Sequence, residues 1–191
     1  MRLFPRILLF PLLATIALAS NDGAENRLKE SVNEVVSIAK SAKDRASLIT
    51  AVQPPLEKIL NFQIMTRRSV GPGWRQFTPD QQAEAIKLFT TLILRTYTAK
   101  FTPGESPAVV FKTSTSPEPG REEITTSAEY KGSTYDVVYR MENQGGWEIT
   151  DVVIEGVSLV GNYRAQFDGE FKQGGANAVL KALRRTVADT K

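Results

Sequence analysis

Residues 146–167, with the sequence GWEITDVVIEGVSLVGNYRAQF, predict a β-strand that runs directly into a helix. In the strand, one face is expected to carry Trp147, Ile149, Asp151 and Val153, and the other Glu148, Thr150, Val152 and Ile154. Both faces then hold apolar side chains, as in a central strand that is covered on both sides. Gly156 permits an abrupt turn, and Ser158 suits a helix N-cap. The helix that follows has apolar residues at helical spacing, namely Leu159, Val160, Tyr163 and Phe167.

The N-terminal residues have the pattern of a secretory signal peptide. Arg2 and Arg6 precede an apolar run that ends in the small-residue motif Ala17-Leu18-Ala19. The run is short for a transmembrane helix and polar residues follow it, which favours cleavage over an uncleaved anchor. We therefore expect a signal peptide over residues 1–19 and a single exported domain over residues 20–191.

The composition excludes several kinds of site. Histidine and cysteine are both absent, which removes the commonest general base, thiol nucleophiles, disulfides and an ordinary zinc site. Removal of the two arginines of the signal from the 24 Lys and Arg leaves 22 against 21 Asp and Glu, a formal charge of +1. We expect no cofactor, no metal and no nucleic-acid partner.

The first hundred residues read as helices. An amphipathic pattern covers residues 24–42, and Asp44 suits the N-cap of a second helix that should stop before Pro54 and Pro55. A third short helix is expected from Leu56 through Met65, ending towards Gly71. Thr78-Pro79-Asp80-Gln81 is a capping box that begins a further helix, which is apolar on most sides up to Tyr97.

After Phe101 the sequence changes to alternating residues and turn formers, as is typical of strands. Three strands are expected over residues 108–113, 124–130 and 134–142, with residues 114–120 as an exposed loop. The strand of residues 147–154 follows as the fourth, and residues 158–172 and 177–187 are the last helices. This order predicts an α+β fold in which helices pack on a curved four-stranded antiparallel sheet.

Several of these segments together resemble the MlaC family of periplasmic phospholipid-binding proteins, also called toluene-tolerance proteins. The residues that carry the resemblance are Gly73-Trp74-Arg75, Thr78-Pro79-Asp80-Gln81, Leu92 to Tyr97, Val137 to Arg140 and Gly146 to Phe167. The most specific part runs from Asp151 to Arg164. The chain departs from the family pattern at Asn61, at Val70 to Gly73 and at Ala85, and the last change would reshape a cavity.

The resemblance implies a fold like that of nuclear transport factors, with helices and sheet enclosing an apolar cavity. It also implies a monomeric periplasmic carrier without catalysis that maintains outer-membrane lipid asymmetry. Its partners would be phospholipid, an outer-membrane lipoprotein complex and the MCE-domain protein of an inner-membrane ABC transporter. A hopanoid-associated carrier of the same family is the alternative.

Acyl chains need an apolar lining, and candidates come from both halves of the chain. From the helices we expect Trp74, Phe89, Leu92, Ile93 and Tyr97; from the sheet we expect Val109, Phe111, Val137, Tyr139, Ile149 and Val153.

Asp151 is the one conspicuous charge in the last strand. We expect it to form a structural ion pair with Arg164. A small pocket enzyme that uses Asp151 with Tyr97 or Tyr139 is a second class of function, and a periplasmic adaptor that binds only proteins is a third. The lack of histidine and of a second pocket carboxylate counts against the enzyme.

Overall fold

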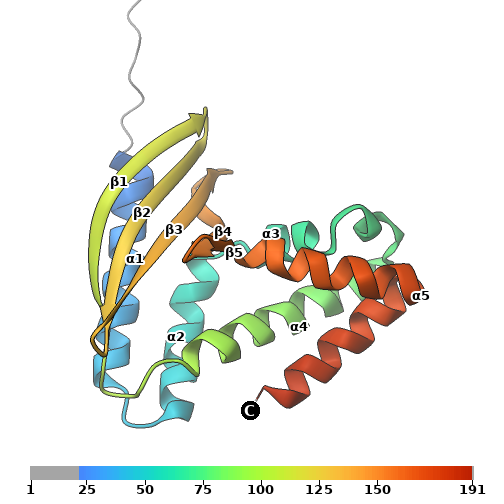
Figure 1. The fold of residues 1–191 in the computed structure, drawn as a ribbon, viewed down its shortest axis with the longest axis horizontal. Coiled ribbons are helices and arrows are strands. Elements are labelled where there is room, and N and C mark those ends of the chain that lie inside the picture. The colour runs from blue at the N-terminus through green and yellow to red at the C-terminus, as the bar shows by residue number, and fades with distance from the viewer. Residues whose placement is uncertain (1–21, 191) are drawn as a thin grey trace, which may run out of the picture.

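The computed structural model describes residues 22–190, so the predicted signal peptide lies outside the described residues. Helices come first, a sheet follows and a long helix ends the chain, which confirms the α+β prediction (Figure 1). The first helical elements are α1 (Asp22–Ser41), α2 (Arg45–Ile59), α3 (Phe62–Val70), the 3-10 helix η1 (Gly71–Gln76) and α4 (Pro79–Thr98). The sheet and the last helix are β1 (Ala108–Glu118), β2 (Arg121–Tyr130), β3 (Ser133–Asn143), β4 (Trp147–Ile154), β5 (Val157–Ser158) and α5 (Leu159–Asp189).

The sheet is open and antiparallel, with its strands in the order β1-β2-β3-β4-β5. The prediction of four strands was wrong, because the sheet has a fifth, short strand, β5. Glu155 and Gly156 both have positive φ, 50° and 76°, and so form a tight turn after β4. Val157 and Ser158 therefore return along β4 and pair with its last two residues.

The predicted loop of residues 114–120 is mostly strand. β1 continues to Glu118 and pairs with β2 through two irregularities, between Phe111 and Thr113 and between Thr115 and Glu118. Such bulges let a strand with extra residues stay paired. Only Pro119 and Gly120 remain as the turn.

A bulge in β4 also corrects the predicted strand faces. Arg140 lies opposite Asp151, but the next residue of β3, Met141, lies opposite Ile149, so Thr150 is the extra residue. Side chains alternate along each strand, so Ile149 shares a face with Val152 and Ile154. Asp151 and Val153 lie on the opposite face.

The helix predicted to stop before Pro54 and Pro55 instead continues to Ile59. Val52, Pro55 and Ile59 lie on one side of α2 and are buried, and this burial outweighs the lost backbone hydrogen bonds. The third predicted helix is correspondingly divided. Its first residues belong to α2, and α3 begins after Asn61, whose side chain accepts a hydrogen bond from the Ile64 amide at 2.8 Å.

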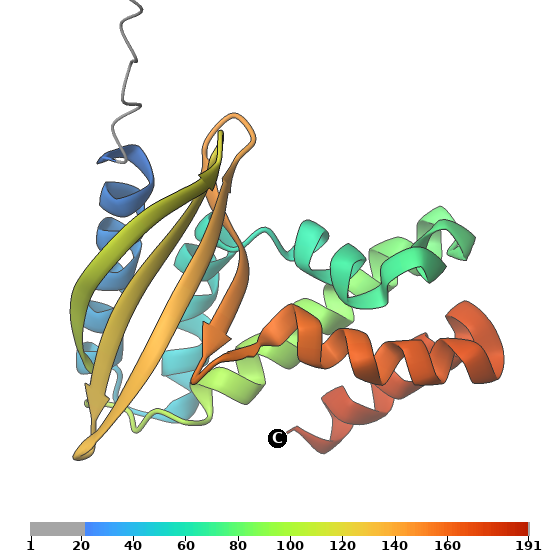
Figure 2. The same cartoon turned by 45° about the horizontal axis from the view of Figure 1, so that its top comes forward.

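The two helices predicted at the end of the chain are confirmed as the two arms of α5. Gly174 and Gly175 have non-helical backbone angles, and Gly175 has φ of 62°, which favours glycine. The chain reverses at this kink, and the second arm returns beside the first (Figure 2).

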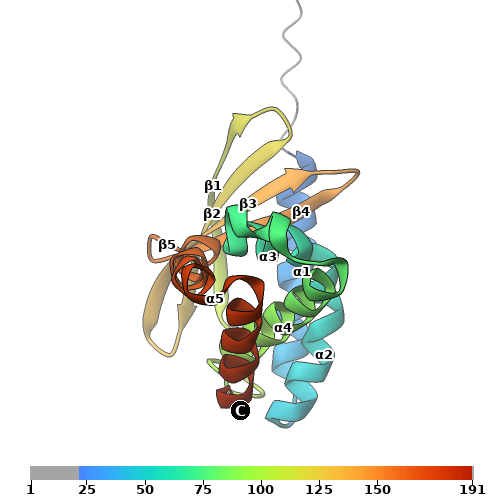
Figure 3. The same cartoon turned by 90° about the vertical axis from the view of Figure 1, so that its right-hand side faces the viewer.

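The elements form two regions. Helices α1 and α2 cover one face of the sheet, which we call the inner face, whereas α3, α4 and α5 extend sideways from the sheet (Figures 2 and 3). The opposite face of the sheet is the outer face. None of the helices within residues 22–190 combines the length and apolar character that crossing a membrane requires.

Candidate functional site

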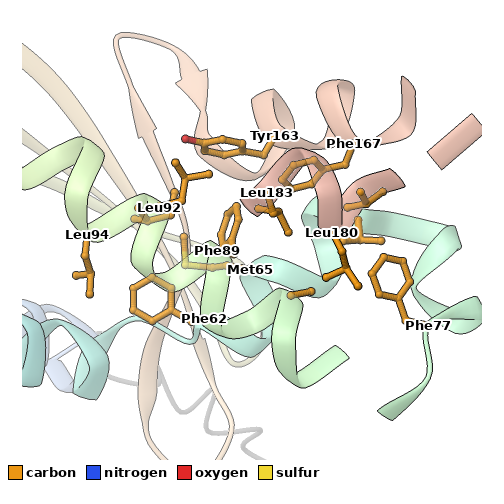
Figure 4. Packing of buried hydrophobic residues seen from close by; sticks show 14 residues of the cluster. Phe62, Met65, Phe77, Phe89, Leu92, Leu94, Tyr163, Phe167, Leu180 and Leu183 are labelled. Atoms are coloured by element: carbon orange, nitrogen blue, oxygen red, sulfur yellow. The ribbon is translucent and has the colours of Figure 1, made fainter. Parts of the chain in front are cut away.

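The helical region has its own apolar cluster, formed by α3, η1, α4 and α5 (Figure 4). Phe89 is completely buried and meets Tyr163 edge to face, with ring centroids 5.2 Å apart. Its neighbours Leu92 and Ile93 are 2% and 4% exposed. Close packing of this kind is typical of a structural core. We call this the helical cluster; its buried members are Phe62, Met65, Val70, Phe77, Ala85, Phe89, Leu92, Ile93, Leu94, Tyr163, Phe167, Val179, Leu180 and Leu183.

A second cluster joins the inner face of the sheet to α1 and the end of α2. We call it the sheet cluster; its buried members are Ala24, Leu28, Ile59, Ile124, Met141 and Ile149. The large apolar side chains around it are only partly buried, and they include Phe111, Tyr139 and Val152. Val32 of α1, which packs against the same cluster, is also only partly buried.

The structure does not bring the predicted lining residues together in one place. Phe89, Leu92 and Ile93 lie inside the helical cluster, and Trp74 and Tyr97 pack against it. On the sheet, the inner face carries Val109, Phe111, Val137, Tyr139 and Ile149, according to the strand register. Val153 pairs with Val138 and lies on the outer face.

Four hollows of 260 to 470 Å³ can be delineated on the surface of residues 22–190. The largest, of about 470 Å³, lies where the ends of β2 and β3 meet Arg68 and Val160. Its charged side chains largely pair with one another; for example, Glu142 contacts both Arg68 and Arg121. None of the predicted lining residues borders any of the four. Within the same residues, no group of three or more carboxylates is placed to hold a metal ion.

Burial raises the pKa of three phenols near these clusters, all of which are neutral at pH 7. Burial, together with the nearby Tyr163 phenol, raises the pKa of Tyr97 to about 12. Burial also raises the pKa of Tyr139, although a hydrogen bond with Thr126 partly opposes it, and raises the pKa of Tyr163. These tyrosines therefore add polarisable, uncharged surface to the interior.

The expected ion pair of Asp151 with Arg164 is corrected by the structure. Asp151 is 6% exposed, and Arg140, directly opposite on β3, donates to its Oδ2 at 3.1 Å. The Ser158 hydroxyl donates to the same oxygen at 2.6 Å, and the Val160 amide donates to Oδ1 at 3.1 Å. Because the bulge at Thr150 places Asp151 opposite Arg140, the arginine of the neighbouring strand is the closer partner. Asp151 still joins β4 to the start of α5.

Arg164 has a different role, at the junction of α3 and α5. Its Nη1 donates to the Arg68 carbonyl at 3.1 Å. Its guanidinium lies against Gly71, where an added Cβ would come within 2.0 Å of the Arg164 Cζ atom. Gly71 also has φ of 73°, so the backbone favours glycine, and a Cβ at this position would displace the Arg164 guanidinium. Arg164 thus fixes α5 on the turn after α3.

Sequence reasoning missed several residues of the apolar interior. Val152, Ile154 and Trp147 share the inner face with Ile149, but no sequence signal marks the bulge that puts them there. Leu60 packs against both the helical and the sheet clusters, and it also bridges to Ile149. The local sequence around Leu60, at the end of α2, gives no indication of this linking position.

Comparisons with known proteins agree with this architecture. A solved structure, that of a phospholipid-binding protein from Ralstonia solanacearum in complex with a phospholipid, superposes with a TM-score of 0.81. It is 23% identical, and the alignment covers 88% of this chain and 98% of that one, so the likeness concerns the fold. A comparison with curated protein sequences finds no match. The sequence profile of the family described as MlaC protein matches residues 29–185, so the chain belongs to the MlaC family.

Proposed function

We propose that this protein is a periplasmic carrier that binds phospholipid acyl chains between the inner face of the sheet and helices α1 and α2. The observation that carries the proposal is the partial exposure of large apolar side chains on this face, among them Val109, Phe111 and Tyr139. The family membership and the phospholipid bound to the Ralstonia solanacearum protein support the same class of ligand.

Acyl chains consist almost entirely of methylene groups. Each buried methylene contributes about 0.8 kcal/mol, so a carrier that leaves an acyl chain in water forfeits most of its affinity. The inner face offers apolar contacts from β1, β3 and β4, and α1 adds Val32, which is partly buried against the sheet cluster. Acyl chains that bury these side chains further would gain affinity without disturbing the helical cluster.

The predicted lining set divides accordingly. In the proposed arrangement the partly exposed Val109, Phe111 and Tyr139 contact the ligand directly, and the buried Val137 and Ile149 form the floor beneath them. Phe89, Leu92 and Ile93 support the wall from behind, with Trp74 and Tyr97 at the surface of the helical cluster. Val153 holds β4 from the outer face. An enclosing cavity like that of nuclear transport factors would form when the ligand enters.

Shuttling between membranes follows from the same proposal. After cleavage of residues 1–19, the monomeric domain would collect lipid from one membrane complex and release it at the other. The partners would be an outer-membrane lipoprotein complex and an inner-membrane ABC transporter with an MCE-domain protein. A carrier for hopanoids would use the same apolar surface and differ only in the bound lipid.

The arrangement of polar groups counts against a pocket enzyme. Asp151 faces outward, whereas Tyr139 lies on the inner face, so the sheet separates these two; the other candidate partner, Tyr97, packs against the helical cluster. Asp151 is also occupied by three hydrogen-bond donors. Asp151 borders the largest of the four hollows, but a general base needs a free oxygen lone pair for the substrate proton, and these three donors compete for its oxygens.

Mass spectrometry of organic extracts of the purified mature protein tests the proposal. We expect a near-stoichiometric amount of diacyl phospholipid. A hopanoid in the extract would support the alternative carrier. Protein that contains no lipid and takes none up from phosphatidylethanolamine and phosphatidylglycerol vesicles would overturn the proposal in favour of an adaptor.

A further inference from the structure

Three large apolar side chains stand out as exposed within residues 22–190: Val110 at 60%, Val157 at 58% and Tyr135 at 42%. Val110 alternates with Phe111 on β1 and therefore lies on the outer face, away from the other two. Tyr135 and Val157 lie on the inner face, on β3 and β5. Val110 is a single exposed valine, which is common on protein surfaces. Tyr135 and Val157 are two exposed apolar residues beside the proposed ligand surface, and such a grouping is typical of an interaction site.

The strand register connects Val157 to the interior. Phe111 pairs with Thr126, Thr126 with Val137, Val137 with Ile154, and Ile154 with Val157. These five residues form one row that crosses the inner face from β1 to β5. Thr126 and Val137 are buried, Ile154 is partly buried and Val157 is exposed. The row therefore leads from the middle of the sheet to solvent at its β5 edge, and it is apolar except at Thr126.

The turn before β5 holds Val157 in place. The Glu155 amide donates to the Asp136 carbonyl at 2.9 Å, and the Asp136 amide donates back to the Glu155 carboxylate. Glu155 and Gly156 have the positive φ values that a tight two-residue turn requires. The exposure of Val157 is thus a property of a fixed turn and not of a loose loop end.

We infer that the β5 edge, lined by Val157, Ile154 and Tyr135, is the portal through which acyl chains enter and leave the inner face. This inference rests on the proposed function. Because the terminal half of an acyl chain is purely apolar, its passage is easiest where apolar side chains continue without interruption from solvent to the binding surface. Along the row, Val157 and Ile154 provide that continuity.

Paired valine substitutions test the portal. Val157→Asp and Val110→Asp introduce the same charge at valines of nearly equal exposure, one at the portal and one on the outer face. The assay follows transfer of a fluorescent phospholipid from phosphatidylethanolamine and phosphatidylglycerol vesicles to lipid-depleted protein. We expect Val157→Asp to slow uptake and release about tenfold, which corresponds to about 1.4 kcal/mol in the barrier. Val110→Asp should transfer lipid at the wild-type rate.

A reversible block guards against misfolding. The chain contains no cysteine, so Val157→Cys and Val110→Cys each provide a single thiol. A bulky disulfide adduct at residue 157 should slow transfer, and reductant should restore it, while the adduct at residue 110 should have no effect. Equal rates for the two positions in both assays would overturn the portal but leave lipid binding intact. Failure of the wild-type protein to take up lipid would instead overturn the proposed function, and the portal with it.

Discussion

The helical cluster and the inner face of the sheet are both apolar, but they are packed differently. In the middle of α4, Phe89 and Leu92 are 0% and 2% exposed and contact aromatic and aliphatic neighbours on α3 and α5. In the middle of β1 and β3, Phe111 and Tyr139 remain partly exposed although two helices cover their face of the sheet. Partly buried apolar residues also border the helical cluster, among them Trp74 and Phe171, but its centre is filled. Under the proposed function, the partly exposed side chains of the inner face are the ligand surface.

Under the proposed function, the two regions divide the work of a carrier. The helical cluster would provide stability that does not depend on ligand, and the sheet would provide the apolar surface that a ligand completes. Leu60 contacts both clusters, and Asp151 joins the sheet to the first turn of α5. Changes in the two regions should consequently have separable effects on unfolding and on lipid content.

The largest expected effect is on stability, from Phe89→Ala. The ring is fully buried between Tyr163 and Phe167, and its removal should lower the free energy of unfolding by about 3 to 5 kcal/mol. Chemical denaturation of lipid-depleted protein measures this loss. Lipid per folded protein should stay unchanged. A variant with normal stability that had lost its lipid would place the acyl chains among the helices.

The next effect concerns the junction of the two regions, at Asp151. Asp151→Asn should cost about 2 kcal/mol of stability, because the buried side chain loses charge-assisted hydrogen bonds to Arg140 and Ser158. Arg164→Gln is the comparison and should cost about 1 kcal/mol through its bond to the Arg68 carbonyl. Urea denaturation of the two single variants and of the double variant measures the changes in the free energy of unfolding. If the two changes add, Asp151 and Arg164 have separate partners. If the change in the double variant differs strongly from the sum of the two single changes, Asp151 and Arg164 interact directly, which would contradict the separate partners.

We expect Phe111→Asp to change the free energy of unfolding less than the substitutions above, but to lower the amount of bound phospholipid clearly. A charge on the inner face should reduce retained phospholipid by about tenfold or more, since it replaces apolar contact with a carboxylate that must stay hydrated. Val110→Asp, one residue away on the outer face, is the control and should retain lipid. Quantitative mass spectrometry of extracts compares them, and equal retention by both variants would exclude the inner face as the ligand surface.

The smallest effect should come from the exposed pair of Glu84 and Arg184, which links the outer sides of α4 and α5. Nε and Nη2 of Arg184 donate to the carboxylate at 2.7 and 2.8 Å, and these bonds lower the pKa of Glu84 from its ordinary value of 4.5. A lowered carboxyl pKa stabilises the fold above the ordinary pKa and loses this contribution as pH falls through the lowered value. Thermal melts of wild type and Glu84→Gln should therefore differ slightly at neutral pH and converge in acid. Salt should also reduce the difference.

Much of this architecture could be predicted from local sequence. The capping box at Thr78, the N-cap at Ser158 and the turn at Gly156 are short-range signals, and each is confirmed. The continuation of α2 through Pro54 and Pro55 could not be predicted, because burial against other elements overrides a local breaker. The bulge at Thr150 could not be predicted from the sequence either. That single extra residue decides the partner of Asp151 and the face on which Ile149 lies.

The site was harder to predict than the fold for a related reason. Apolar side chains of a core and of a ligand surface have the same composition, and only packing distinguishes them. The sequence therefore could not distinguish Phe89 from Phe111, and both were predicted to line the ligand cavity. Their different burial, which depends on contacts between distant segments, separates them.

The chain contains two tryptophans, one beside each cluster, and they allow the most direct test of where the ligand lies. Trp147 packs against the sheet cluster, and Trp74 packs against the helical cluster. Trp74→Phe and Trp147→Phe each leave one indole, whose fluorescence is measured after loading with phospholipid that carries bromine along its acyl chains. If the acyl chains lie on the inner face, the bromines quench Trp147 strongly and Trp74 weakly. Stronger quenching of Trp74 than of Trp147 would contradict the account.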